Sequence, residues 1–434
     1  MTLSPTSMRA PLTPDTLDDL IRRGLASPDA RQGRAAAFAA FAAADMPRLE
    51  RTDLSKVHLD DFHVVIEAGD VPADIRETMH DEDHEQRAGL FIQSNGEVIH
   101  ARLRPALAAR GVILGSLSQA TATAASKAAR RLGSVIRADE NKLTALNSAF
   151  WTGGLFLYVP RNVTIEAPVQ VVFHADALGG AVFPRVLVIA EENAAVTILE
   201  ETISPAGDAP LLAVSVTEVI AGPNAQVKYI HLQNWGESAI AFITQRADVG
   251  RDAAINWTHG ILGAGLMRSF TEARLGAEGA STEMLGVQFG SGTQHHDIFT
   301  LMNHVAPLTD GDLLFRGVLR DQARSVFEGL IKIHPGAQDA NSYLHDNMLL
   351  LSKDARADSI PSLEIEANQV RASHGATVSE IDEDWIFYLQ TRGLSRAQAT
   401  RAIVDGFFEP IMQRITLESV QDRLRDAFDR KLDA

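Results

Sequence analysis

The chain has 434 residues, of which 45% are hydrophobic, and it carries a formal net charge of −16 at pH 7. This length suits about three average domains or one large solenoid with attachments, and the composition is that of a folded protein with a sizeable core. The negative charge argues against nucleic acid and anionic membrane surfaces as main partners, because both repel an acidic chain.

The sequence contains no cysteine. This excludes disulfides, a cysteine nucleophile, a cysteine-ligated zinc site and persulfide chemistry on this chain. No stretch of about 18 apolar residues occurs, so no transmembrane helix is predicted. The first residues lack the basic and then apolar pattern of a secretory signal, which favours a cytoplasmic location.

Residues 1–133 are predicted to form a region of helices and strands. Alanine-rich helices are expected at residues 33–45 and 120–132. The turn Ser94-Asn95-Gly96 lies between apolar runs and predicts a β-hairpin. The acidic run from His80 to Glu85 offers metal-binding groups, but a charge run of this kind is more often a solvated loop.

Residues 134–378 have a different sequence pattern from residues 1–133, because short apolar runs alternate there with polar or glycine turns. A polar corner ending in alanine recurs between the runs, at intervals of 31, 28, 27, 43 and 32 residues: Ala194, Ala225, Ala253, Ala280, Ala323 and Ala355. The long interval contains residues 290–310 and leaves room for an extra loop or rung. Strands that repeat at a nearly fixed period predict a β-solenoid.

Each coil buries its inward apolar row only by stacking on another coil, so the last coil exposes unpaired strand edges. Residues 361–378 form this last rung. We expect them to meet either the helical tail or another protein, which is a physical reason for dimerisation.

Residues 379–434 are predicted to form a C-terminal domain of three helices. Asp382 is a suitable N-cap for the first, and Ser395 with Gln398 forms a capping box for the second. The second helix is expected to run to about Phe408 before Pro410 disturbs it. The third carries an apolar stripe, for which packing within the chain is a commoner outcome than an open groove: Leu417, Val420, Leu424, Phe428 and Leu432.

Several groups of polar residues are candidates for chemistry. His374 is a competent iron ligand as a neutral imidazole, although it could equally serve only as a hydrogen-bonding residue of the last rung. Strand alternation splits a second histidine group, because one face takes His295 and Asp297 and the other takes His296 and His304.

Two pairs of carboxylates resemble acid/base sites, although acidic ladders on a solvated solenoid are commoner: Glu200 with Glu201, and Glu364 with Glu366. The sequence has no P-loop, dinucleotide-binding glycine motif or nucleophile elbow. ATP binding by this chain is therefore not expected.

Three blocks of residues occur in order along the chain. The first is Leu146-Asn147-Ser148-Ala149-Phe150-Trp151-Thr152-Gly153-Gly154, followed by Tyr158-Val159-Pro160 and Pro168. The second is Val326-Phe327-Glu328-Gly329. The third is His374-Gly375-Ala376-Thr377, followed by Phe387-Tyr388-Leu389 and Gly406-Phe407-Phe408-Glu409-Pro410. Together they resemble the SufB/SufD family of iron–sulfur cluster assembly proteins.

The resemblance implies a mainly β fold, a right-handed parallel β-helix flanked by N-terminal and C-terminal helical regions. It also implies a SufB-like scaffold as heterodimer partner and a SufC-like ABC ATPase that docks on residues 379–434. His374 would face a cysteine of the scaffold and act as a shared ligand of a transient iron–sulfur cluster. The ATPase-binding candidates are Trp385, Tyr388, Phe407, Phe408 and Pro410.

The absence of cysteine favours the SufD branch of the family. The SufB branch carries cysteines for sulfur acceptance and cluster binding, and one of these would fall near Pro361. Clusters are held mainly by thiolates, so this chain alone is expected to hold no cofactor. The resemblance therefore implies a non-catalytic subunit of a SufBCD-type complex.

Two alternatives remain open. One is a carbohydrate-active β-helix enzyme, which usually works outside the cell and lines a groove with aromatic residues, whereas aromatics make up 6% of this chain. The other is a homodimeric paralogue with no role in cluster chemistry.

Overall fold

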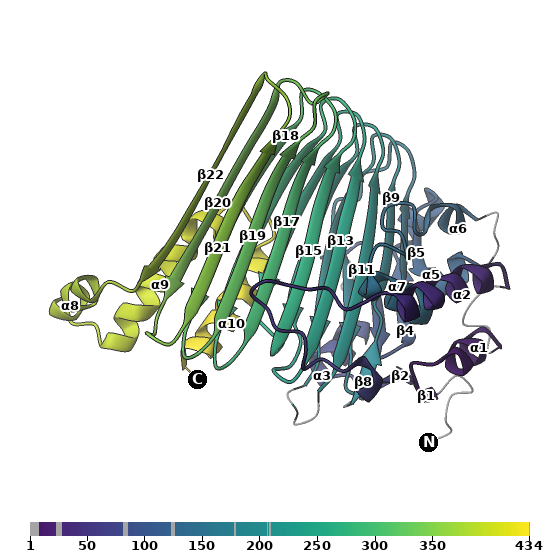
Figure 1. The fold of residues 1–434 in the computed structure, drawn as a ribbon, viewed down its shortest axis with the longest axis horizontal. Coiled ribbons are helices and arrows are strands. Elements are labelled where there is room, and N and C mark those ends of the chain that lie inside the picture. The colour runs from purple at the N-terminus through teal and green to yellow at the C-terminus, as the bar shows by residue number, and fades with distance from the viewer. Residues whose placement is uncertain are drawn as a thin grey trace.

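In the computed structural model the chain winds into a parallel β-helix of two facing sheets, with helices near both ends (Figure 1). The structure describes residues 8–22, 28–80, 86–122, 126–177, 179–205, 207 and 210–433. From β10 onward, successive strands alternate between the sheets, so each coil contributes one strand to each. The predicted β-solenoid is confirmed.

Sheet A has 12 strands. They are β1 (Met8–Pro11), β2 (His63–Ile66), β5 (Ile113–Ser116), β6 (Leu155–Val159), β8 (Gly180–Val182), β9 (Arg185–Ala190), β11 (Leu212–Ala221), β13 (Ile240–Val249), β15 (Leu266–Leu275), β17 (His295–His304), β19 (Arg324–Ile333) and β21 (Arg356–Ile365).

Sheet B has 10 strands. They are β3 (Gly89–Ser94), β4 (Glu97–Leu103), β7 (Val169–His174), β10 (Ala195–Ile203), β12 (Gln226–Asn234), β14 (Ala254–Ile261), β16 (Ser281–Gly290), β18 (Asp310–Leu319), β20 (Ala340–Leu350) and β22 (Val370–Glu380). The predicted hairpin is confirmed: β3 and β4 pair antiparallel, and Asn95 in the turn has φ 48°.

The helices flank this body. Before the β-helix lie α1 (Pro14–Arg22), α2 (Pro28–Ala43), the 3₁₀ turn η1 (Leu59–Asp61), α3 (Ala73–His80), α4 (Pro105–Ala109), α5 (Leu117–Ala120), α6 (Lys127–Arg131) and α7 (Lys142–Phe150). After it lie α8 (Glu383–Thr391), α9 (Arg396–Met412) and α10 (Glu418–Asp433). Among the helices in the described part of the chain, none combines the length and apolar character that crossing a bilayer requires.

The core lies between the two sheets. Coils stack in register, so residues at equivalent positions form columns along the axis, as where Tyr229 pairs with Trp257. Their rings lie 5.1 Å apart. Because neighbouring strands are only about 4.8 Å apart, each column is a continuous apolar or polar row. The inward rows form the largest hydrophobic cluster of the molecule.

One line of corners is built from residues that tolerate a left-handed backbone. Asn162, Asn193, Asn224 and Asp252 have φ between 53° and 60°. Asparagine and aspartate adopt this conformation more readily than other non-glycine residues. The side-chain amide of Asn224 donates to Asn193 and that of Asn193 donates to Asn162, each over 2.7 Å. The buried alanine after each of the last three corners leaves room for the chain to turn.

The long alanine interval is not an insertion. Ala253 and Ala280 precede β14 and β16 in sheet B, and the equivalent positions in the next two coils are Thr309, just before β18, and Ala340, the first residue of β20. Ala323 instead precedes β19 in sheet A, so the interval of 43 residues joins two different corners. Residues 290–310 contain β17, a regular strand paired with β15 and β19.

The terminal helices cover opposite outer faces. Helices α1, α2 and α7 pack over the early strands of sheet A. Helices α9 and α10 pack over sheet B, where Leu424 and Phe428 of the predicted apolar stripe are buried. Arg414, after α9, strengthens this contact by an ion pair with Glu283 of β16 over 2.6 Å. The stripe thus packs against the chain's own sheet.

The expected stop before Pro410 is wrong. Helix α9 continues to Met412 with Pro410 inside it. Proline removes one backbone hydrogen bond and crowds the carbonyl four residues earlier. Burial of Phe408, Ile411 and Met412 against sheet B outweighs that cost. The capping box of Ser395 and Gln398 is confirmed.

Candidate functional site

The C-terminal end of the β-helix is open. The described strands end at β21 in sheet A and at β22 in sheet B, which pair only with β19 and β20 (Figure 1). Apolar side chains are exposed there, with Tyr343 at 41%, Ile365 at 42% and Val378 at 44% of their surface. Unpaired N–H and C=O groups beside exposed apolar side chains favour strand pairing with another chain.

His374 lies on the last strand, β22, and is exposed. It is in register with Leu344 of β20, which belongs to the interior cluster. In-register partners point to the same side of a sheet, so the imidazole faces the open mouth between the sheets. The next residue, Gly375, leaves room for His345 of β20, since an added Cβ would lie 3.3 Å from its Nδ1 atom.

One coil deeper, a carboxyl group that sequence reasoning missed bridges the two sheets. Asp346 of β20 is fully buried and accepts a hydrogen bond from the hydroxyl of Ser359 in β21. Its Oδ1 atom has no hydrogen-bond partner. Burial raises the pKa of Asp346 to about 7. The only signal in the sequence is a charged residue at an inward position between Leu344 and Met348.

A second buried polar group lies deeper in the interior. The Tyr229 hydroxyl donates to Glu200, and burial raises the pKa of this carboxyl to about 7. His231 of β12 lies beside it, with Nε2 3.6 Å from Glu200 Oε1. Burial lowers the pKa of His231 to about 4, so the imidazole is neutral near pH 7, whereas the Glu200 carboxyl is about half protonated there.

The paired-carboxylate candidates do not form acid/base sites. Glu200 points inward, whereas Glu201 points outward and forms an ion pair with Arg423 of α10. Glu364 pairs with Lys332 over 2.8 Å, and Glu366 is exposed. Strand alternation places Glu200 and Glu201 on opposite faces of β10.

The histidine group is divided as predicted. His296 and His304 are buried inside, where His296 lies 2.9 Å from the Gly263 carbonyl and His304 lies 2.8 Å from Thr309. Asp297 faces outward and pairs with Arg268. No group of three metal-binding side chains is present among the described residues. Of the acidic run from His80 to Glu85, residues 81–85 lie outside the described part.

The tail aromatics fall into two classes. Trp385 and Tyr388 of α8 are 60% and 48% exposed, and α8 projects from the body beyond the open end (Figure 1). Phe387, which was predicted only as part of a motif, is 68% exposed. Phe408 is buried and stacks on Phe428 with ring centres 4.4 Å apart. Its side chain is therefore not at the surface.

The other two tail candidates lie on α9. Phe407 is half-buried beneath the guanidinium of Arg316, 5.2 Å from its ring centre, and Pro410 is exposed. The exposed aromatic surface of the tail thus lies mainly on α8.

Iron–sulfur clusters require several thiolate or imidazole ligands. The open end supplies the imidazole of His374, and the chain supplies no thiolate. The residues present therefore fit part of a ligand set that a second chain would have to complete.

Comparison with known proteins identifies the family of the chain. Residues 173–407 match the family described as "SUF system FeS cluster assembly, SufBD core domain", and residues 18–171 match the "SufBD protein N-terminal region". The chain is 33% identical over 345 residues to the iron–sulfur cluster assembly protein SufD of Bacillus subtilis, covering 79% of each chain.

Staphylococcal proteins are similar to about the same degree. An iron–sulfur cluster assembly SufBD family protein of Staphylococcus epidermidis is 30% identical over 379 residues, covering 84% of this chain and 82% of that one. A Staphylococcus aureus protein of the same family is 29% identical over the same length. This chain belongs to the SufBD family of iron–sulfur cluster assembly proteins.

Proposed function

We propose that this protein is the SufD-type, non-catalytic subunit of a SufBCD-type assembly complex. Its open end would pair with a SufB-like scaffold, and its tail would bind a SufC-like ABC ATPase. The observation that carries the proposal is that β21 and β22 each have one edge with no described partner strand. His374 lies exposed on β22, in a chain without cysteine.

The cluster is the cargo of this complex. The scaffold would supply thiolates, and His374 would supply one imidazole from across the interface. An imidazole that replaces a thiolate raises the reduction potential of a cluster. Because the chain alone has too few ligands, we expect the cluster to form only where the two end rungs meet.

The ATPase-binding surface is proposed for α8. Exposed aromatic side chains on a short projecting helix leave apolar surface in water when the chain is alone. A partner protein that buries them gains binding energy. Movement of ATPase subunits bound there would be transmitted to the adjacent end rung, because only residues Ile381 and Asp382 separate β22 from α8.

Co-expression tests the proposal. We expect one complex that contains this chain, a SufB-like scaffold and a SufC-like ATPase, with iron and sulfide in the complex and not in this chain alone. A chain that purifies only as a homodimer would instead favour the paralogue without cluster chemistry. Cleavage of polysaccharides by the purified chain would favour the carbohydrate-active enzyme.

A further inference from the structure

Both sheets of the β-helix end in strands that have one edge without a partner strand. Among the described strands these are β4 and β22 in sheet B, and β1, β5 and β21 in sheet A. Such an edge carries unpaired N–H and C=O groups on which another chain can add a strand. Proteins prevent this addition with short strands, charged side chains, register shifts or proline. The five edges differ in these protections.

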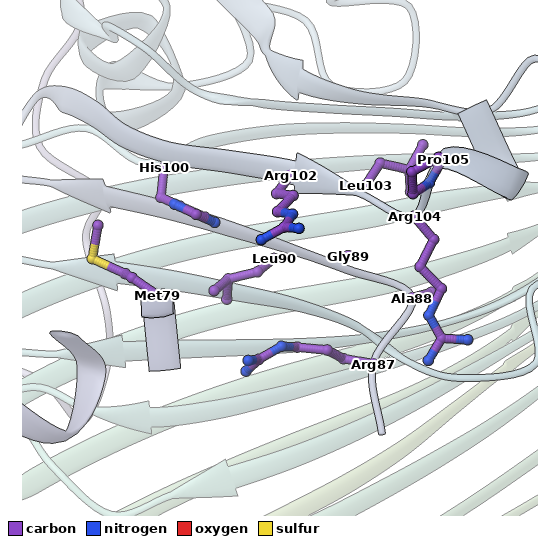
Figure 2. A pocket seen from close by; sticks show the side chains of 10 residues that line it. All are labelled: Met79, Arg87, Ala88, Gly89, Leu90, His100, Arg102, Leu103, Arg104 and Pro105. Carbon is purple, nitrogen blue, oxygen red and sulfur yellow. The ribbon is translucent and has the colours of Figure 1, made fainter. Parts of the chain in front are cut away.

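Three of the edges are protected by length, charge or proline. Strands β1 and β5 have four residues each, and β1 ends in Pro11. Strand β4 pairs with β3 through a shift of register after Ile92. Figure 2 shows Arg102 on β4 and Arg104 just after it, at the point where Pro105 begins α4. Addition of a strand is therefore unfavourable at these three edges.

Proline interrupts the fourth edge, that of β21. The N–H group of Arg356 donates to the Ala323 carbonyl beside β19 over 3.0 Å. The N–H group of Glu366 donates to Ile333 of β19 over 2.9 Å. Consecutive strand residues direct their N–H groups to opposite sides, and Pro361 lies an odd number of positions from both donors, so its nitrogen faces the free edge. Because proline has no N–H group, β21 can form only short ladders on either side of Pro361.

The edge of β22 has none of these protections. The strand has 11 residues without proline, and no Lys, Arg, Asp or Glu occurs between Ala372 and Ser379. The N–H group of Ile381 donates to Leu350 of β20 over 2.9 Å, so the even-numbered residues direct their N–H groups to the free edge. These residues include Ala372, His374, Ala376 and Val378. Among the described edges, β22 alone is open along its whole length.

We propose that the partner adds a strand along β22, and that Pro361 prevents continuous pairing along β21. This inference rests on the proposed function, in which the partner is a SufB-like scaffold. Exposed apolar side chains flank the mouth on both sheets, Ile365 on β21 and Val378 on β22. A lone strand on β22 would leave Ile365 in water, so the partner that fits ends in a β-helix coil of its own.

A second copy of this chain also ends in such a coil. It would bring no thiolate to complete the ligand set of His374, because the sequence has no cysteine. The scaffold is therefore the occupant that we propose. Its strand would lie directly beside His374, whose N–H group faces the same edge.

Titration of the full-length chain with a SufB-like scaffold tests the role of β22. Ala376→Pro removes an N–H group that faces the free edge and no hydrogen bond to β20. We expect this variant to fold and to bind the scaffold at least about tenfold more weakly than wild type. Ala376→Ser keeps the N–H group and is the matched control with unchanged affinity. Ala372→Pro removes another N–H group of the same edge and takes the place of Ala376→Pro if that variant does not fold.

Self-association of the chain alone tests the role of Pro361 without the scaffold. Pro361→Ala restores the missing N–H group and opens β21 to continuous pairing between copies. We expect sedimentation velocity to show self-association at least about tenfold tighter than that of wild type. Ser362→Ala is the matched control, because Ser362 is exposed and its N–H group faces β19.

Equal scaffold binding by Ala376→Pro and wild type would overturn the inference and leave the proposed function intact. Unchanged self-association of Pro361→Ala would also overturn it. A wild-type chain that does not bind the scaffold would instead contradict the proposed function. If that chain formed a homodimer that Ala376→Pro dissociates, a second copy would be the occupant of β22, and the scaffold would be excluded.

Discussion

At the residue scale, the face of the strand on which a polar side chain lies decides whether that side chain is buried. Glu200 and Asp346 are buried inward and have raised pKa values of about 7, whereas their neighbours Glu201 and His345 face outward. Strand alternation could be read from the sequence, and it divided the histidine group correctly. A carboxyl group at an inward position needs a hydrogen-bond partner from another coil, as Tyr229 provides for Glu200.

His374→Ala should lower the iron and sulfide content of the co-expressed complex by at least about tenfold, because removing groups around a metal site costs this much or more. The complex should still assemble, since His374 is exposed and contributes no packing to the β-helix core. Iron and acid-labile sulfide assays after size-exclusion chromatography measure both effects. His345→Ala, on the adjacent strand, is the matched control. Normal cluster content in His374→Ala would remove this residue from the chemistry.

Glu200→Gln should make stability less dependent on pH. The folded-state pKa of about 7 lies above the ordinary 4.5, so the folded protein binds more protons than the unfolded chain between these values, and wild-type stability falls as pH rises through that range. The variant avoids this loss, which amounts to about 3 kcal/mol above pH 7. Denaturant unfolding from pH 4 to pH 8 measures the difference.

Glu201→Gln is the control for this experiment, because Glu201 faces outward and pairs with Arg423. A difference between Glu200→Gln and wild type that stays constant with pH would contradict the raised pKa of Glu200.

At the scale of elements, the tail divides into a packed part and a projecting part. Helices α9 and α10 cover sheet B, whereas α8 buries Ile386 and exposes its aromatic side chains. The sequence predicted the three helices and the apolar stripe. It did not show that the chain's own sheet covers the stripe, because periodicity gives the face of a helix and not its partner.

The double variant Trp385→Ala/Phe387→Ala should lose the ATPase subunit in a pull-down and keep the scaffold. Its unfolding midpoint should match that of wild type, because both side chains are more than half exposed. Phe408→Ala should instead lower the free energy of unfolding by about 3–5 kcal/mol, as expected for a buried aromatic side chain. Retention of the ATPase by the double variant would exclude α8 as the docking surface.

At the scale of the whole molecule, the strand period predicted the β-helix, and the cysteine count predicted that a second chain must complete any cluster site. The alanine series did not follow one corner, because Ala323 and Ala355 precede strands of sheet A while Ala253 and Ala280 precede strands of sheet B. Corners of both sheets share the same small-residue chemistry, so sequence alone cannot tell them apart.

Amide hydrogen exchange on β21 and β22 tests most directly whether the open end of the β-helix pairs with another chain. Each strand has one edge that no described strand pairs with, so amides directed outward from that edge should exchange rapidly in the chain alone. When a SufB-like scaffold is added, we expect protection of residues 356–365 and 370–380. A complex that forms while these amides keep their free-chain exchange rates would contradict pairing through the end rung.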